Sequence, residues 1–131
     1  MKRLFIVAAF ILLSSFTLLA QNNIVPAKYA LKHIGHEVTI CDKVYSSEPT
    51  SNQTLLYLGG DNPKQLLTVI IKATDIAKFK GHPETDFNGK DVCITGVVTN
   101  NKGKAEIVVT DPKQIKPYMV DNPVKQKSSL Q

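Results

Sequence analysis

The stretch "KDVCITGVVTNNKGKAEIVVTDPKQI", residues 90–115, decides the fold of this chain. Apolar and polar side chains alternate on both sides of a turn at Asn100 to Gly103, and asparagine and glycine tolerate the positive φ angles of tight hairpins. We therefore predict two strands, Val92 to Thr99 and Ala105 to Thr110, that form a hairpin.

An earlier stretch, "HEVTICDKVYSS" (residues 36–47), shows the same alternation. The period of two predicts a strand with Val38 and Ile40 on one face. Each of the two stretches holds one of the two cysteines of the chain, Cys41 and Cys93. Their similar positions raise the question of whether the cysteines are partners across neighbouring strands.

The other predicted elements follow from the same periodicities and from turn residues. A short helix from Pro26 to His33 ends at Gly35. In chain order the remaining elements are strands at Leu55–Leu58 and Leu66–Lys72, a short helix that begins near Thr74 and includes Phe79, and a loop over 81–89. The predicted order is helix, three strands, helix, two strands.

Residues 1–20 have the layout of a secretory signal peptide. A basic start at Lys2 and Arg3 precedes a short apolar run, and a small residue precedes Gln21, where we expect cleavage. The apolar run is short for a membrane span, so we expect no integral membrane segment after cleavage, with an uncleaved anchor as the alternative. The sequence thus predicts a secreted or periplasmic protein.

After cleavage the chain would be about 110 residues long, the size of one small domain. We predict one domain over 21–116 and a flexible polar tail over 117–131. The whole chain has 16 basic and 11 acidic residues, and every basic residue after Arg3 is lysine. Lysine is a solvated point charge, whereas arginine grips phosphates with a planar fork. The basic balance is therefore weak evidence for nucleic acid, and lysines that keep an exported domain soluble are the alternative.

No motif in the sequence indicates catalysis. The chain has no Gly-x-Ser-x-Gly elbow, no phosphate-cradling glycine loop and no paired carboxylates at a meaningful spacing. A catalytic metal needs at least three converging ligands. The predicted helix ends at Gly35, between His33 and His36, so these two need not share a face, and His82 is distant. We expect surface histidines, no metal, no cofactor and no enzymatic activity.

Three strands, a helix and a hairpin follow one another as in the five-stranded Greek-key OB barrel. Four segments resemble small bacterial OB-fold domains of the nucleic-acid-binding grouping, some of which stand alone behind a signal peptide and some beside staphylococcal-nuclease-like domains. They are "HIGHEVTICDKVYSS", "LLYLGG", "LLTVIIKATDIAKF" and "GKDVCITGVVTNNKGKAEIVVTDPKQI". The resemblance covers about Ala27 to Lys116 and implies an all-β fold in which five strands close into a small barrel, leaving no open edges.

In such a barrel the first strand lies antiparallel to the fourth. That arrangement turns Val92, Ile94 and Val98 inward and puts both cysteines on outward rows of adjacent strands. We expect a disulfide between Cys41 and Cys93, which would close a loop of about 50 residues and add roughly 4 kcal/mol in the chain-entropy model. Two separate reduced thiols are the alternative, and a redox-active role lacks a Cys-x-x-Cys motif.

OB barrels present ligands to their second and third strands and the flanking loops. We expect Tyr57 to point outward on the second strand, and Thr68, Ile70 and Lys72 to be exposed on the third. The candidate nucleic-acid-binding residues are Lys43, Tyr45, Tyr57, Lys72, Lys102 and Lys104. Tyrosines would stack on bases and lysines would meet phosphates, although the chain offers few aromatic platforms.

The resemblance therefore implies an exported, non-catalytic OB-fold protein that binds single-stranded nucleic acid. OB barrels also bind proteins, glycans and small ligands, so an envelope-protein, glycan or small-ligand module is one alternative. An accessory domain for a separate secreted nuclease is another, because no nuclease module is present here to carry that catalysis. The salt dependence of affinity distinguishes nucleic-acid binding from glycan binding, since lysine–phosphate contacts release counterions and glycan contacts do not.

Overall fold

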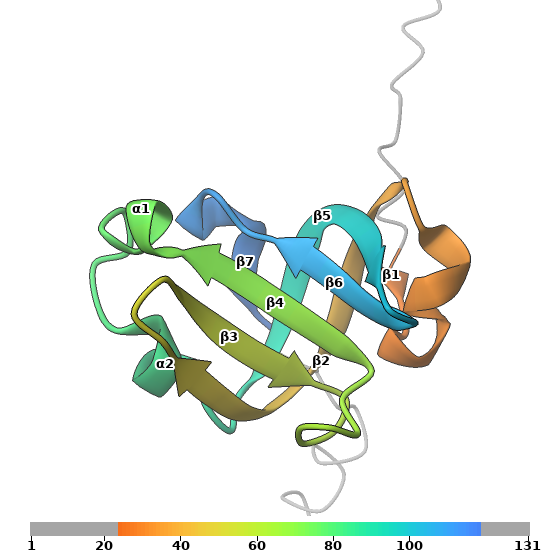
Figure 1. Cartoon of the computed structure of the whole chain (residues 1–131), viewed down its shortest axis with the longest axis horizontal. Coiled ribbons are helices and arrows are strands. Elements are labelled where there is room, and N and C mark those ends of the chain that lie inside the picture. Colours follow the sequence, from red (N-terminus) through yellow and green to blue (C-terminus); the bar gives the residue numbers. More distant parts are fainter. Residues whose placement is uncertain (1–23, 119–131) are drawn as a thin grey trace, which may run out of the picture.

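The computed structural model describes residues 24–118, which fold into strands with a few short helices (Figure 1). The expected signal peptide at 1–20 and most of the expected tail lie outside the described residues. The elements are β1 (Ile24–Val25), η1 (Ala27–His33), β2 (Glu37–Pro49), β3 (Gln53–Leu58), β4 (Leu67–Lys72), α1 (Ala73–Ile76), α2 (Pro83–Asp86), β5 (Asp91–Asn101), β6 (Lys104–Val108), η2 (Pro112–Gln114) and β7 (Ile115–Pro117).

The five longest strands pair in a closed ring, in the order β2, β3, β4, β6, β5 and back to β2. The two long strands make closure possible because each serves two neighbours. The first half of β2 pairs with β5 and its second half with β3, with a bulge between Val44 and Ser46 where the partner changes. In the same way β5 leaves β2 after Val97 and pairs with β6 from Val98 onward.

The predicted order of the five main strands is confirmed, but the described residues contain two further strands that were not predicted. The short strand β1 adds to β2 in parallel, and β7 adds to β5 antiparallel. The fold also continues past the expected boundary at residue 116, because Pro117 is paired with Val92 and the Tyr118 amide donates to the carbonyl of Asp91. Segments of two and three residues carry too little periodicity to be recognised in a sequence.

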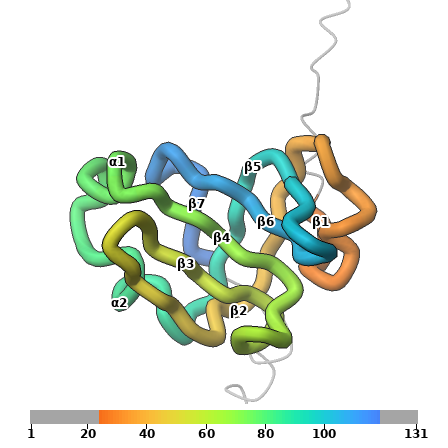
Figure 2. Tube along the Cα trace, viewed as in Figure 1, coloured from red at the N-terminus to blue at the C-terminus, as the bar shows by residue number. Residues whose placement is uncertain are grey.

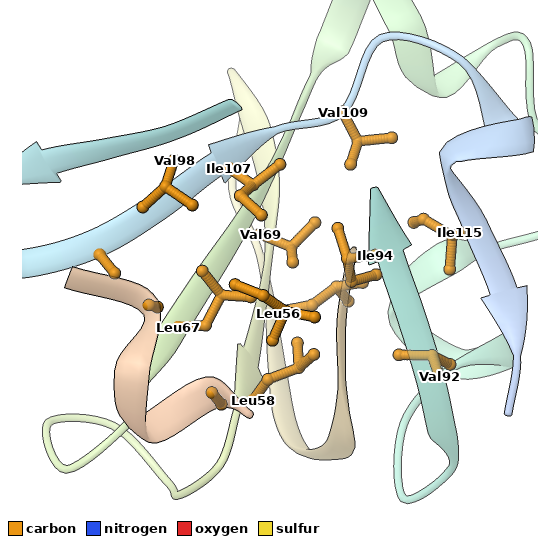
Figure 3. Close-up of a cluster of buried hydrophobic side chains, with 14 of the residues drawn as sticks. Leu56, Leu58, Leu67, Val69, Val92, Ile94, Val98, Ile107, Val109 and Ile115 are labelled. Carbon is orange, nitrogen blue, oxygen red and sulfur yellow. The ribbon is translucent and has the colours of Figure 1, made fainter. Parts of the chain in front are cut away.

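The inward rows expected from alternation form the core (Figure 3). Side chains from every strand of the ring are fully buried, among them Ile40, Leu56, Val69, Ile94 and Ile107. Gly96 lies on the inward row of β5, one residue before the last that pairs with β2, and a Cβ there would lie 2.5 Å from Cγ2 of Ile107. The absence of a side chain thus lets β5 approach β6 closely at its bend.

The predicted disulfide between Cys41 and Cys93 is confirmed. The two residues lie directly opposite each other on β2 and β5, with Cα atoms 4.0 Å apart. In the next pair along these strands on the same face, the hydroxyl groups of Thr39 and Thr95 are 2.8 Å apart and hydrogen-bonded. The covalent link therefore fastens the pair of strands that closes the ring, across a separation of 52 residues.

The helices differ in detail from their prediction. The N-terminal helix occupies the expected residues as a 3₁₀ helix. The helix expected near Thr74 is the four-residue α1, which ends at Ile76, before Phe79. A second four-residue helix, α2, lies in the stretch predicted as a loop. The rings of Phe79 and Phe87 pack edge to face against each other, with centroids 6.5 Å apart, and both lie against the core, which anchors this connection. In the described part of the chain, no helix has the length and apolarity to cross a bilayer.

Removing the disulfide should lower the free energy of unfolding by roughly 4 kcal/mol, because the denatured chain regains the entropy of a loop of 52 residues. The measurement is urea denaturation of the Cys41→Ala/Cys93→Ala variant beside the oxidised protein. The matched control is Thr39→Val/Thr95→Val, which removes a hydrogen bond from the neighbouring pair and should cost only about 1 kcal/mol. Equal stability of the cysteine variant and the parent would contradict the claim that the disulfide stabilises the closed ring of strands.

Candidate functional site

A cavity of about 290 Å³ opens on the outer face of β3, β4 and β6, at the end where the β5–β6 hairpin turns. These three strands lie side by side in Figure 1. The cavity is lined by Leu55, Tyr57, Gln65, Thr68, Asn101, Lys102, Lys104 and Glu106. Strand register assembles this face, because Tyr57 pairs with Thr68 and Thr68 in turn pairs with Glu106.

Tyr57 lies on the outer face as predicted, but its side chain is only 5% exposed, so it is not the open stacking platform that was expected. Its hydroxyl donates to Oε2 of Glu48 at 2.7 Å. Burial, the hydrogen bond to Glu48 and the charges of Glu48 and Asp61 raise the pKa of Tyr57 to about 12. The ring is therefore a fixed, neutral wall of the cavity.

Two further expectations for the third strand are corrected in part. Thr68 was expected to be exposed and is buried, because Gln65 lies against it and donates from Nε2 to its Oγ1 at 3.3 Å. Ile70 is half-buried, and Lys72 is exposed as predicted. On the outer face of β4, exposure thus increases from Thr68 through Ile70 to Lys72.

The hairpin brings two predicted lysines to the cavity. Its turn consists of Lys102 and Gly103, with φ angles of 50° and 82°, and Asn101 pairs with Lys104 on either side. This is the two-residue turn in which asparagine would be favoured at the first position, and lysine stands there instead. Nζ of Lys104 donates to the carbonyl of Pro63 at 2.6 Å, which fastens the hairpin to the loop before β4.

The other predicted residues lie elsewhere. Nζ of Lys43 is 5.3 Å from the ring centroid of Tyr45, whose side chain is 51% exposed beside the bulge of β2. Lys72 lies at the opposite end of β4 from Thr68, about 13 Å along the strand. The cavity therefore gathers Tyr57 and the two hairpin lysines, while Lys43, Tyr45 and Lys72 do not line it.

The sequence interpretation missed several cavity residues. Alternation alone would have put Leu55 and Glu106 on the outer face, since their neighbours Leu56 and Ile107 face the core. No local signal identifies Gln65, which lies in the loop before β4. Its Oε1 is buried without a hydrogen-bond partner among the described residues. Such an atom is unusual, because an unpaired buried acceptor destabilises a fold.

A second cavity, of about 230 Å³, lies on the outer face of the other half of the sheet, between β1, β2, β5 and β7. Thr39, Cys93, Thr95 and Lys116 are among its lining residues, and none of the predicted nucleic-acid-binding residues is. Within residues 24–118, no three His, Cys, Asp or Glu side chains gather as a metal site requires.

Comparison with known proteins supports the fold and no closer relationship. No family model and no curated protein matches the chain. A structure of yeast Stn1 and Ten1 aligns with a TM-score of 0.51 at 13% identity over 86% of this chain and 70% of that one.

Two synthetase structures align with TM-scores of 0.50 at 12% identity. They are the asparaginyl-tRNA synthetase from Pyrococcus horikoshii, over 82% of this chain and 26% of that one, and a putative aspartyl-tRNA synthetase from Leishmania major Friedlin, over 77% and 21%. The chain thus spans about a quarter or less of either synthetase. Stn1, Ten1 and the matched domains of the synthetases have OB folds, which supports the expected OB fold, and identities this low show the fold alone.

The phenol of Tyr57 should ionise near pH 12, because the folded protein buries it against Glu48. The tyrosinate absorbance titration of the protein minus that of Tyr57→Phe should show one transition near that pH. Since the raised pKa favours the folded state, the contribution of Tyr57 to stability is complete below about pH 10 and is lost as the pH rises to about 12. A transition near pH 10 in the difference titration would show that this phenol is solvated.

Proposed function

We propose that this protein is an exported, non-catalytic OB-fold protein that binds single-stranded nucleic acid on the outer face of β3, β4 and the β5–β6 hairpin. The observation that carries the proposal is one cavity lined by an aromatic residue, two amide residues and two lysines: Tyr57, Gln65, Asn101, Lys102 and Lys104. Its volume of about 290 Å³ is at the lower end of ligand pockets, so it suits a single base or sugar.

The charges in the cavity favour a base inside and phosphates at the rim. Glu106 lines the cavity and would repel a phosphate there, whereas Lys102 and Lys104 are exposed on the hairpin. Leu55 and Tyr57 supply an apolar wall for the face of a base, and the neighbouring amides supply donors and acceptors for its edge. Lysines without arginines favour binding with little sequence preference.

Tyr45 is a second contact in this proposal. Its half-exposed ring, with Lys43 above it, offers the open stacking surface that Tyr57 lacks. Lys72 is exposed at the far end of β4, so it would contact only a nucleic acid that runs along β4 away from the hairpin.

Glycan or small-ligand binding is the second candidate, and a specific observation favours it. The carboxylates of Glu48 and Glu106 flank Tyr57 on the face that holds the lysines. A neutral polyhydroxyl ligand tolerates such mixed charges better than a polyanion does. Such a ligand would bind with little dependence on salt, which separates it from nucleic acid.

Export and the lack of catalysis belong to the proposal as well. The signal-peptide layout of residues 1–20 and the disulfide between Cys41 and Cys93 support an oxidising compartment outside the cytoplasm. The groups that line the cavity suit holding a ligand by stacking and hydrogen bonding.

The deciding experiment titrates the oxidised protein into labelled single-stranded DNA and RNA at low and at physiological salt. The variant that tests the hairpin contact is Lys102→Asn, because it removes the charge while asparagine suits the positive φ of the turn. We expect it to weaken binding several-fold and to reduce the slope of log affinity against log salt by about 0.7. The matched control is Lys116→Asn, an exposed lysine on β7 that should leave binding unchanged.

Absence of binding at low salt would remove the nucleic-acid proposal. Salt-independent binding to a glycan array by the same protein would then support the second candidate. Equal losses from Lys102→Asn and Lys116→Asn would show that binding is spread over the whole surface and has no site at the hairpin.

A further inference from the structure

A smaller cavity of about 170 Å³ adjoins the proposed site on the side of η1. Lys28 and Leu31 of η1 line it on one side, and Leu66 and Ala105 line it on the other. Gln65 and Lys104 line both this cavity and the larger one. Figure 2 shows the turn of the β5–β6 hairpin beside η1.

The two side chains between the cavities can yield to a ligand. The Oε1 atom of Gln65 has no hydrogen-bond partner in the described residues, and its Nε2 makes one long bond, 3.3 Å, to Thr68. Lys104 is bound to the carbonyl of Pro63, but an ammonium group has three donors and can also contact a phosphate. A single-stranded nucleic acid can therefore pass from one cavity to the other over Gln65 and Lys104.

The period of the 3₁₀ helix gives η1 two useful outer rows. With three residues per turn, positions three apart lie on one side of the helix. Ala27 and Ala30 form the buried row, and Lys28 and Leu31 form the row that lines the smaller cavity.

The third row holds Tyr29 and Lys32. The Nζ atoms of Lys28 and Lys32 each lie 5.0 Å from the ring centroid of Tyr29, whose side chain is 41% exposed. An open aromatic ring flanked by two cations thus stands beside the smaller cavity.

Charge around η1 suits a phosphate backbone better than charge in the larger cavity does. Residues 27–36 contain two lysines, two histidines and no acidic residue. Across the smaller cavity the exposed Lys104 adds a further cation. Leu31 and Leu66, 45% and 42% exposed, supply apolar surface of the kind that covers the face of a base.

We propose that a bound single strand continues from the larger cavity, over Gln65 and Lys104, to η1. There Tyr29 stacks on a further base, and Lys28 and Lys32 contact the phosphates. This inference rests on the proposed function and gives the site a second half that the sequence interpretation did not include.

The test compares a dinucleotide, one base of which fits the larger cavity, with an oligonucleotide of about ten residues, within the roughly 4–16 nucleotides that an OB fold covers. Tyr29→Ala should weaken binding of the long oligonucleotide by about five-fold or more and leave dinucleotide binding unchanged. Tyr29→Trp keeps a stacking surface and should retain the affinity. Lys28→Gln/Lys32→Gln should reduce the salt slope by about 1.4 for the long oligonucleotide only.

The matched control is Tyr118→Ala. Tyr118 is 39% exposed, close to the value for Tyr29, but it lies beside Asp91, at the opposite end of β5 from the hairpin. Circular dichroism of each variant checks that the fold is retained.

Each outcome decides one question. If neither oligonucleotide binds the unchanged protein, the proposed function fails and this extension fails with it. If both bind and Tyr29→Ala leaves the long oligonucleotide unaffected, the extension alone is overturned. If Tyr29→Ala changes only the sedimentation of the free protein, η1 is an interface between protein chains and the extension is likewise overturned.

Discussion

The fold depends on the pairing of β2 with β5, which closes the ring of strands. These strands are far apart in the chain, so their pairing has to overcome the entropy of closing a loop that contains β3, β4 and both α-helices. The disulfide between Cys41 and Cys93 lies within this pairing. By limiting the freedom of the unfolded chain across the same loop, it stabilises the contact that costs most entropy to form.

Closure also decides which side chains a ligand can reach. Once the ring is shut, one row of each strand is committed to the core and the other to the surface, so the composition of the outer row becomes the composition of the candidate site. β5 must bend to serve both β2 and β6, and Gly96 permits the close approach to Ile107 at that bend. The end of β5 then carries the hairpin lysines over the outer face of β4.

The outer face combines fixed and adjustable groups. Tyr57 is held by burial and by its hydrogen bond to Glu48, and both raise the pKa of its phenol. Lys102, by contrast, is exposed on a two-residue turn, and the Oε1 atom of Gln65 has no hydrogen-bond partner among residues 24–118. A rigid wall with the exposed cation of Lys102 beside it suits a ligand with a flat apolar group and a mobile charged chain.

The sequence by itself determined the order of strands, the inward rows of β2 and β5 and the hairpin, because period-two alternation and turn chemistry are local signals. The partnership of the two cysteines followed from the resemblance to OB-fold domains, in which the first strand lies beside the fourth. The sequence also identified Lys102 and Lys104 as surface cations, and both line the candidate site. Only the tertiary structure decided that Tyr57 is covered, that Gln65 joins the cavity, and that η1 stands beside the hairpin. These facts depend on which distant segments meet when the ring closes, and alternation reports only the face a side chain occupies, not what lies over it.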